Sequence, residues 1–122
     1  MPRARACRYK IGPEKGAILD ALVRLVRPRL AVELGSFVGY SAVRIARLLP
    51  PDGLLVCVEA NPQCVAALRA VVSHAGLSAK VAVEQGLAGE LVRRLRDKYG
   101  PAQLLFEVRA DRAVRRGCET GL

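Results

Sequence analysis

Short apolar runs alternate with segments of helical periodicity along most of this 122-residue chain, and this alternation limits the possible folds more than any other feature. The apolar runs predict strands at residues 30–34, 54–59, 80–84 and 103–108. The helical periods, with their proline and glycine stops, predict helices at 14–27, 40–49, 62–74 and 87–98. Strands that alternate with helices of this length form right-handed crossovers and a mainly parallel sheet. We therefore expect an α/β fold, a Rossmann-like parallel sheet with flanking helices.

The predicted strand at 103–108 is expected to lie at an edge of the sheet. Strands joined in this way are expected in the order 3-2-1-4, which leaves the fourth strand at one edge of the sheet. Its apolar residues Leu104, Leu105 and Phe106 would then lie on an open edge. Because an open edge strand offers unpaired backbone groups to other chains, we expect self-association through this edge.

The chain is basic, but mainly near its start. It carries 20 Lys and Arg against 11 Asp and Glu, and residues 1–29 hold eight of the basic and two of the acidic side chains. Solvated arginine is the commoner reason for such a skew, and only 4% of the residues are aromatic and suited to stacking on bases. We expect no nucleic-acid partner. The chain divides into a basic tail at 1–10, one partial domain at 11–108 and an irregular tail at 109–122.

Membrane and secretory signals are not evident in the sequence. No apolar run approaches the roughly 18 residues of a membrane span, and the basic first residues lead to Tyr9 and Lys10 rather than to an apolar signal core. The four cysteines form no Cys-x-x-Cys pair and there is one histidine, so neither a zinc site nor a disulfide framework is indicated. We expect a cytoplasmic protein with reduced thiols and no membrane span.

The segment between the first strand and its helix, ELGSFVGYS at residues 33–41, has the pattern of a ligand-binding turn. In such sheets, ligands bind at the carboxyl ends of the strands. Gly35 would let the backbone approach a ligand closely, and Gly39 would let the helix begin tightly, with its first N–H groups free for an acidic group. Close packing between helix and strand also selects glycine, so the turn alone is weak evidence for a nucleotide site.

A second acidic residue strengthens this interpretation. Glu59 ends the second predicted strand, 26 residues after Glu33, where its carboxylate could accept hydrogen bonds from both hydroxyls of a ribose. The chain lacks the G-x-G-x-x-G turn that accommodates a pyrophosphate, which argues against NAD, and it lacks a phosphate-binding G-K-S/T loop. A nucleoside without phosphates, such as S-adenosylmethionine, fits this pattern better.

Four stretches resemble the catechol O-methyltransferase family. They read GPEKG from residue 12, VELGSFVGYSAVRIARLL from 32, VEANP from 58 and HAGLSAKV from 74, and Gly86 continues the match. The resemblance covers about residues 9–106 and implies the amino-terminal part of an S-adenosylmethionine-dependent O-methyltransferase, with four of the family's seven strands. It also implies a catechol as the small-molecule substrate and a place in catecholamine metabolism.

The same resemblance implies a set of cofactor-binding residues. Glu33 would lie near the amino group of S-adenosylmethionine, Glu59 would hold the ribose, and Ala60 would lie beside the adenine. The complete implied set is Ile11, Glu33, Gly35, Tyr40, Ser41, Glu59, Ala60 and Gly86. Phe37 stands where the family usually has tyrosine.

In this chain, the part of the site that would bind the methyl acceptor is less complete than in the family. The family holds magnesium with carboxylates and an amide at and beyond the ends of its fourth and fifth strands, and a lysine just after the first metal ligand acts as base. The fourth strand here ends without the expected aspartate, and we do not expect Glu107 or Asp111 to replace it. We therefore assign no metal ligand and no catalytic residue.

Two other functions stay open. The chain could be a truncated product that binds the cofactor or a partner chain without catalysis. A nucleic-acid methyltransferase is the third alternative, but the Asn/Asp-Pro-Pro-aromatic motif expected after its fourth strand is absent, and Asn61-Pro62 follows the second strand instead.

Overall fold

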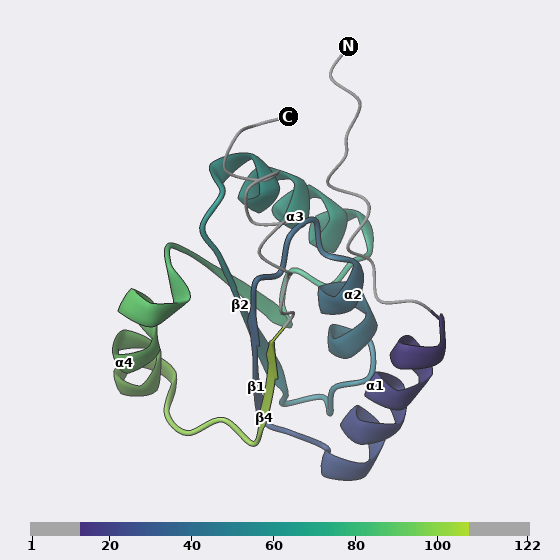
Figure 1. The fold of residues 1–122 in the computed structure, drawn as a ribbon. Coiled ribbons are helices and arrows are strands. Elements are labelled where there is room, and N and C mark those ends of the chain that lie inside the picture. The colour runs from purple at the N-terminus through teal and green to yellow at the C-terminus, as the bar shows by residue number, and fades with distance from the viewer. Residues whose placement is uncertain (1–12, 108–122) are drawn as a thin grey trace.

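The computed structural model describes residues 13–107, whose four strands form a single parallel sheet in the order β3-β2-β1-β4 (Figure 1). The elements are α1 (Pro13–Val26), β1 (Leu30–Leu34), α2 (Tyr40–Ala46), β2 (Leu54–Glu59), α3 (Pro62–His74), β3 (Val81–Gln85), α4 (Ala88–Tyr99) and β4 (Leu104–Glu107). The predicted Rossmann-like fold and strand order are confirmed. Ile11 and the predicted tails at 1–10 and 109–122 lie outside the described residues.

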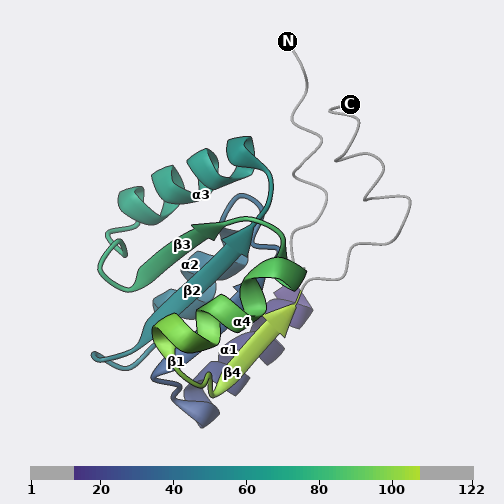
Figure 2. The same cartoon turned by 90° about the vertical axis from the view of Figure 1, so that its left-hand side faces the viewer.

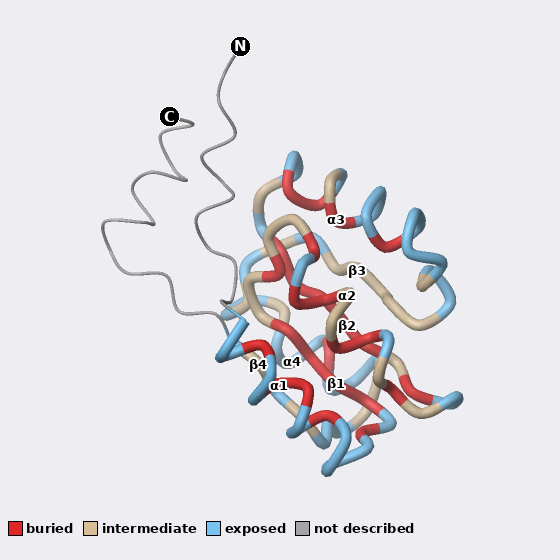
Figure 3. The backbone as a smooth tube through the Cα atoms, turned by 90° about the vertical axis from the view of Figure 1, so that its right-hand side faces the viewer, coloured by how far each residue is buried: buried red, intermediate tan, exposed pale blue. Residues whose placement is uncertain are grey.

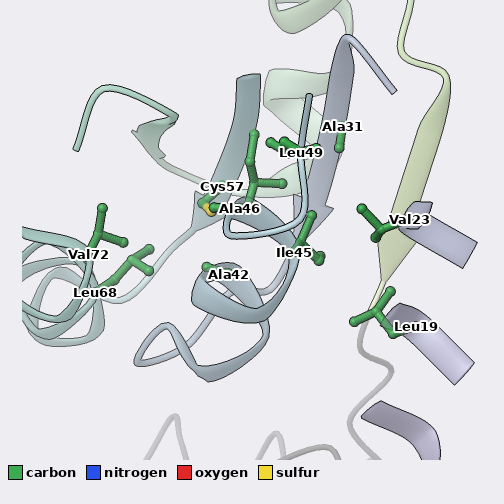
Figure 4. Packing of buried hydrophobic residues seen from close by; sticks show 11 residues of the cluster. Leu19, Val23, Ala31, Ala42, Ile45, Ala46, Leu49, Cys57, Leu68 and Val72 are labelled. Carbon is green, nitrogen blue, oxygen red and sulfur yellow. The ribbon is translucent and has the colours of Figure 1, made fainter. Parts of the chain in front are cut away.

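The helices form two layers around the sheet. Helices α1, α2 and α3 cover one face and α4 covers the other, while β2, β3 and β4 run in the same direction across the view of Figure 2. Buried residues concentrate on β1 and β2 and on the inner sides of the helices (Figure 3). The larger core packs Leu19, Ile45 and Leu68, one from each of the three helices, against the sheet residues Ala31 and Cys57 (Figure 4).

Helix α1 forms where predicted but buries a different face. The apolar residues that predicted its period are at positions 18, 19, 22, 25 and 26, and of these only Leu19 is buried. The buried side consists of Gly16, Leu19, Asp20 and Val23. Leu25, by contrast, is 81% exposed. The predicted period missed this face because it left out Val23 and because a glycine and an aspartate make up the rest of the face beside Leu19.

Helix α2 ends earlier than predicted, at Ala46 instead of residue 49. The chain then turns through Leu48 and Leu49, whose amides donate to Ile45 and Ala46. The Lys80 ammonium donates to the carbonyls of Leu49 at 3.0 Å and Pro50 at 3.3 Å. This ammonium joins the residue just before β3 to the segment after α2, so it fixes the end of the connection before β2.

Strand β4 is joined to the sheet on one side only. The Gln103 side-chain oxygen accepts from the backbone N–H groups of Arg29 at 3.0 Å and Leu30 at 2.9 Å, which fixes the start of β4 beside β1. On the described residues nothing pairs with the other edge of β4, and Leu105 is 63% exposed there. Across residues 13–107, no helix is long and apolar enough to span a membrane.

Gly39 gives a test of this local geometry. Its φ of +97° is in the left-handed region, and a Cβ there would lie 2.9 Å from Cδ1 of Leu68. We expect Gly39→Ala to lower the free energy of unfolding by about 1–3 kcal/mol, because alanine is strained at that φ and crowds the core.

Gly89 in α4 is the matched control, since a Cβ added there would meet no other atom within 4 Å. Gly89→Ala should change stability little or raise it by about 0.5 kcal/mol. Urea denaturation of both variants measures the difference. Equal stability of the two variants would show that the turn before α2 tolerates a side chain.

Candidate functional site

Two acidic residues lie on the same face of the sheet near the carboxyl ends of its central strands. Glu33 of β1 pairs in register with Cys57 of β2, and Glu59 is two residues further along β2. Residues two apart on a strand point to the same face. Cys57 belongs to the core under α2 and α3, so both carboxyl groups project to that side of the sheet. Burial is the main cause of the raised pKa of Glu33, and the charge of Glu59 raises it slightly further.

The Glu33 carboxyl group is buried without a hydrogen-bond partner. Its side chain is 0% exposed, and neither Oε1 nor Oε2 accepts a hydrogen bond from the residues that the structure describes. Burial raises its pKa to about 7, while the nearby hydroxyls of Ser41 and Ser36 act in the opposite direction. A buried carboxylate with two free acceptors is costly unless a donor arrives from outside the chain. An ammonium group is a donor of the required charge.

The Glu59 carboxyl group is buried as well, but one of its oxygens is occupied. Oε2 accepts from the backbone N–H of Ala60 at 3.1 Å. Burial raises the pKa of Glu59, and the bond from Ala60 partly opposes this. Within the described part of the chain no donor reaches Oε1, which leaves this oxygen for a hydroxyl of a ligand.

The turn between β1 and α2 is held close to both carboxyls. The backbone N–H groups of Gly35 and Ser36 donate to the carbonyl of Val58 at 2.9 and 3.2 Å. Gly35, Phe37 and Gly39 all have positive φ, at +79°, +51° and +97°. These bonds attach the turn to β2 immediately before Glu59, so Glu33, the turn and Glu59 form one continuous site.

The remaining predicted residues divide into two groups. Gly86 belongs to the site, because its N–H donates to the carbonyl of Glu59 at 3.0 Å. Ala60 follows Glu59 directly and is exposed. Tyr40 lies on the outer side of α2, 40% exposed, and its hydroxyl accepts from Nη1 of Arg44 at 3.1 Å. The structure therefore brings Glu33, Gly35, Ser41, Glu59, Ala60 and Gly86 to one end of the sheet, with Tyr40 at its margin.

Two residues at or beside this site were not predicted from the sequence. Ser36 is buried, and its hydroxyl donates to the backbone carbonyl of Glu33 at 3.5 Å. Asp20 of α1 binds Arg44 of α2 and Arg47, the residue that follows this helix. The sequence signal for Asp20 was an acidic residue one position after the buried Leu19, with two arginines three residues apart on the next helix.

An apolar groove of about 620 Å³ runs between α2 and α3 on the outside of the molecule. Its lining residues are Tyr40, Val43, Arg44, Arg47, Ala70, Val71, His74 and Ala75. Neither Glu33 nor Glu59 lines it. The groove is therefore separate from the strand ends, apart from Tyr40 at one end.

The described residues do not fit a magnesium ion. From residue 13 to 107, no three His, Cys, Asp or Glu side chains come together in a way that could hold a metal. Glu107 ends β4, and Asp111 lies outside the described residues.

Solved O-methyltransferases, two of which hold SAM or SAH, share this fold. The O-methyltransferase TomG from Streptomyces achromogenes, solved with SAM, has a TM-score of 0.77 and 31% identity over 83% of this chain and 46% of its own. An O-methyltransferase from Bacillus cereus, solved with SAH, has a TM-score of 0.80 and 29% identity over 86% and 48%.

The sequence comparisons are more specific. The O-methyltransferase family pattern matches residues 3–114, and the chain belongs to this family. It is 45% identical over 89 residues to catechol O-methyltransferase of Mus musculus and 40% identical over 98 residues to catechol O-methyltransferase B of Danio rerio. These matches cover 73% and 80% of this chain but 34% and 37% of the relatives, so the chain spans about a third of their length.

The buried Glu33 carboxyl predicts an unusual dependence of stability on pH. Its pKa is about 7 in the folded chain against 4.5 when exposed, so the folded state binds the proton more tightly than the unfolded state. This contribution is fully present below pH 4.5 and is lost as the pH rises through about 7. We expect the free energy of unfolding to fall by about 3 kcal/mol between about pH 5 and 8.

Glu33→Gln is the control, because it cannot ionise and should remove most of this fall. Glu59, whose pKa is also raised, accounts for any residual slope of the same sign. Asp20 and Glu84 have lowered pKa values and act only at more acidic pH. Urea denaturation at several pH values measures the slopes, and identical slopes for the parent chain and Glu33→Gln would refute the buried, unpartnered carboxyl.

Proposed function

We propose that this chain binds S-adenosylmethionine at the carboxyl ends of β1 and β2, as the methyl donor of an O-methylation reaction. The observation that carries the proposal is the Glu33 carboxyl group, buried with both oxygens free of described donors. The methionine end of the cofactor carries an ammonium group, which would donate to these oxygens and neutralise their charge. The solved relatives TomG and the Bacillus cereus enzyme, which hold SAM and SAH, support the choice of ligand.

The other site residues take the roles that the family resemblance implies. The free Oε1 of Glu59 would accept from a ribose hydroxyl, and Ala60 and Gly86 would border the adenine. Gly35 would let the backbone approach the methionine end, beside the Ser41 hydroxyl. Tyr40 would lie at the margin of the site, beside the methionine end of the cofactor. Ile11 is kept in the proposal on the resemblance alone, because it lies outside the described residues.

For the acceptor we propose a catechol hydroxyl, on the strength of the curated relatives named catechol O-methyltransferase. In the reaction the acceptor oxygen would bond to the methyl carbon as the carbon–sulfur bond breaks. The hydroxyl would lose its proton and the cofactor would become S-adenosylhomocysteine. The described residues supply the donor side of this reaction. Since they do not fit magnesium, no step is assigned to a metal.

A second candidate is a cofactor-binding product that does not turn over by itself. It is favoured by the share of the relatives' length that the chain spans, which is about a third. We further propose a cytoplasmic location. Cys57 is a buried thiol that forms no disulfide within the described part of the chain, which is typical of a reducing compartment.

Removal of the Glu59 carboxylate tests the ribose contact. We expect Glu59→Ala to weaken S-adenosylhomocysteine binding by about 1.5–3 kcal/mol, because a hydrogen bond to a charged acceptor is lost. Isothermal titration calorimetry measures the affinity. Asp52→Ala is the matched control, since Asp52 is an exposed carboxylate paired with Arg29 in the turn before β2, and it should bind as the parent chain does. Unchanged affinity in Glu59→Ala would remove Glu59 from the site.

We also propose that the open edge of β4 associates with a second copy of the chain. The parent chain should then show a mass that rises with concentration in sedimentation velocity, and Leu105→Lys should reduce the association because it places a charge on the exposed edge. Leu25→Lys on α1 is the control for a general loss of apolar surface. A parent chain that stays monomeric, or an oligomer broken by Leu25→Lys and not by Leu105→Lys, would contradict the edge contact.

A further inference from the structure

Helix α2, which begins at the site, is held against α1 by one buried aspartate. The Asp20 carboxylate accepts from Nε of Arg44 at 2.8 Å and from Nη2 of the same residue at 3.1 Å. It also accepts from Nη2 of Arg47 at 2.8 Å. Arg44 is in α2 and Arg47 is its C-cap with helical backbone angles, so the two arginines, three residues apart, lie on the same side. Asp20 thus holds a helix of only seven residues at two points.

The same arginine continues the connection to the first residue of α2. Nη1 of Arg44 donates to the Tyr40 hydroxyl at 3.1 Å. Gly16 leaves room for this arrangement, because a Cβ there would lie 2.5 Å from the guanidinium carbon of Arg44. A chain of hydrogen bonds therefore runs from Asp20 through Arg44 to Tyr40.

The beginning of α2 is the part of the helix that matters for the ligand. Tyr40 lies between Gly39, whose N–H donates to the carbonyl of Ser36 at 3.2 Å, and Ser41, whose hydroxyl lies near the Glu33 carboxyl. The segment that follows α2 is held separately, because Lys80 donates to the carbonyls of Leu49 and Pro50. A tilt of the first turn of α2 would therefore displace Ser41 and the glycine turn, while Glu59 on β2 would keep its place.

We propose that Asp20 is a positioning residue for the methionine end of the S-adenosylmethionine site, acting through Arg44 on Tyr40 and the first turn of α2. This inference rests on the proposed function. Asp20 is charged at neutral pH, because the hydrogen bond from Arg44 lowers the pKa of its carboxyl. Its buried place and three charge-assisted hydrogen bonds make it the main fixed point of the contact between α1 and α2.

The test compares two ligands that differ only at the methionine end. S-adenosylhomocysteine carries the amino-acid group, whereas methylthioadenosine keeps the nucleoside and lacks that group. We expect Asp20→Asn to weaken S-adenosylhomocysteine binding about three- to tenfold and to leave methylthioadenosine binding unchanged. Asp52→Asn makes the same chemical change at an exposed ion pair in the turn before β2, and both affinities should stay at parent values. A general loss of stability would lower both affinities together.

A double-mutant cycle tests the route. Tyr40→Phe removes the hydroxyl that Arg44 holds and should give a selective loss of the same kind, and Asp20→Asn added to it should cost little more. Arg44→Lys keeps the positive charge but loses the paired donors of the guanidinium group, so it should also weaken S-adenosylhomocysteine binding selectively. This variant replaces Asp20→Asn if Asp20→Asn does not fold.

The outcomes separate the two levels of the proposal. Equal weakening of both ligands, no weakening, or full additivity of Asp20→Asn and Tyr40→Phe would overturn the role of Asp20 while leaving the cofactor site intact. Failure of the parent chain to bind either ligand would instead refute the proposed function.

Discussion

The unpaired carboxyl group of Glu33 is the constraint on which the account of this molecule depends. Glu33 lies on the central strand β1, and its register partners are Cys57 on β2 and Phe106 on β4. Neither neighbour can donate a strong hydrogen bond to a carboxylate. An apolar residue would pack here without this cost, so the stability of the sheet does not explain the glutamate. A cationic ligand group explains it, because such a group supplies both the charge and the donors.

The rest of the site is arranged around this position. The turn from Gly35 to Gly39 is bonded to Val58, which immediately precedes Glu59, so movement of one acidic residue relative to the other is restricted. Gly86 is bonded to the carbonyl of Glu59 and brings the end of β3 to the same place. The backbone of three strands thus fixes the two carboxyls, and the short helix α2 is positioned by side chains from α1 and by Lys80.

The sequence predicted most of the fold and the two carboxylates because the information is local. Apolar runs of four to six residues ending in Glu33-Leu34-Gly35 or in Glu59 identify strand ends directly. The packing of α1 was not predictable in the same way. Its buried side depends on the contact of Asp20 with Arg44 and Arg47, which are far from it in the sequence. This contact forms only when α1 and α2 lie side by side. The outward position of Tyr40 depends on a local contact instead, since Arg44, four residues later on α2, donates to its hydroxyl.

The central claim is that a nucleoside with an ammonium group binds between Glu33 and Glu59, and the most direct measurement is an NMR titration of the ¹⁵N-labelled chain with S-adenosylhomocysteine. We expect the amide signals of Gly35, Ser41, Ala60 and Gly86 to shift together and saturate at one ligand concentration, while those of Val71 and Ala75 in the outer groove stay in place. Shifts confined to the groove, or none at all, would refute binding between Glu33 and Glu59.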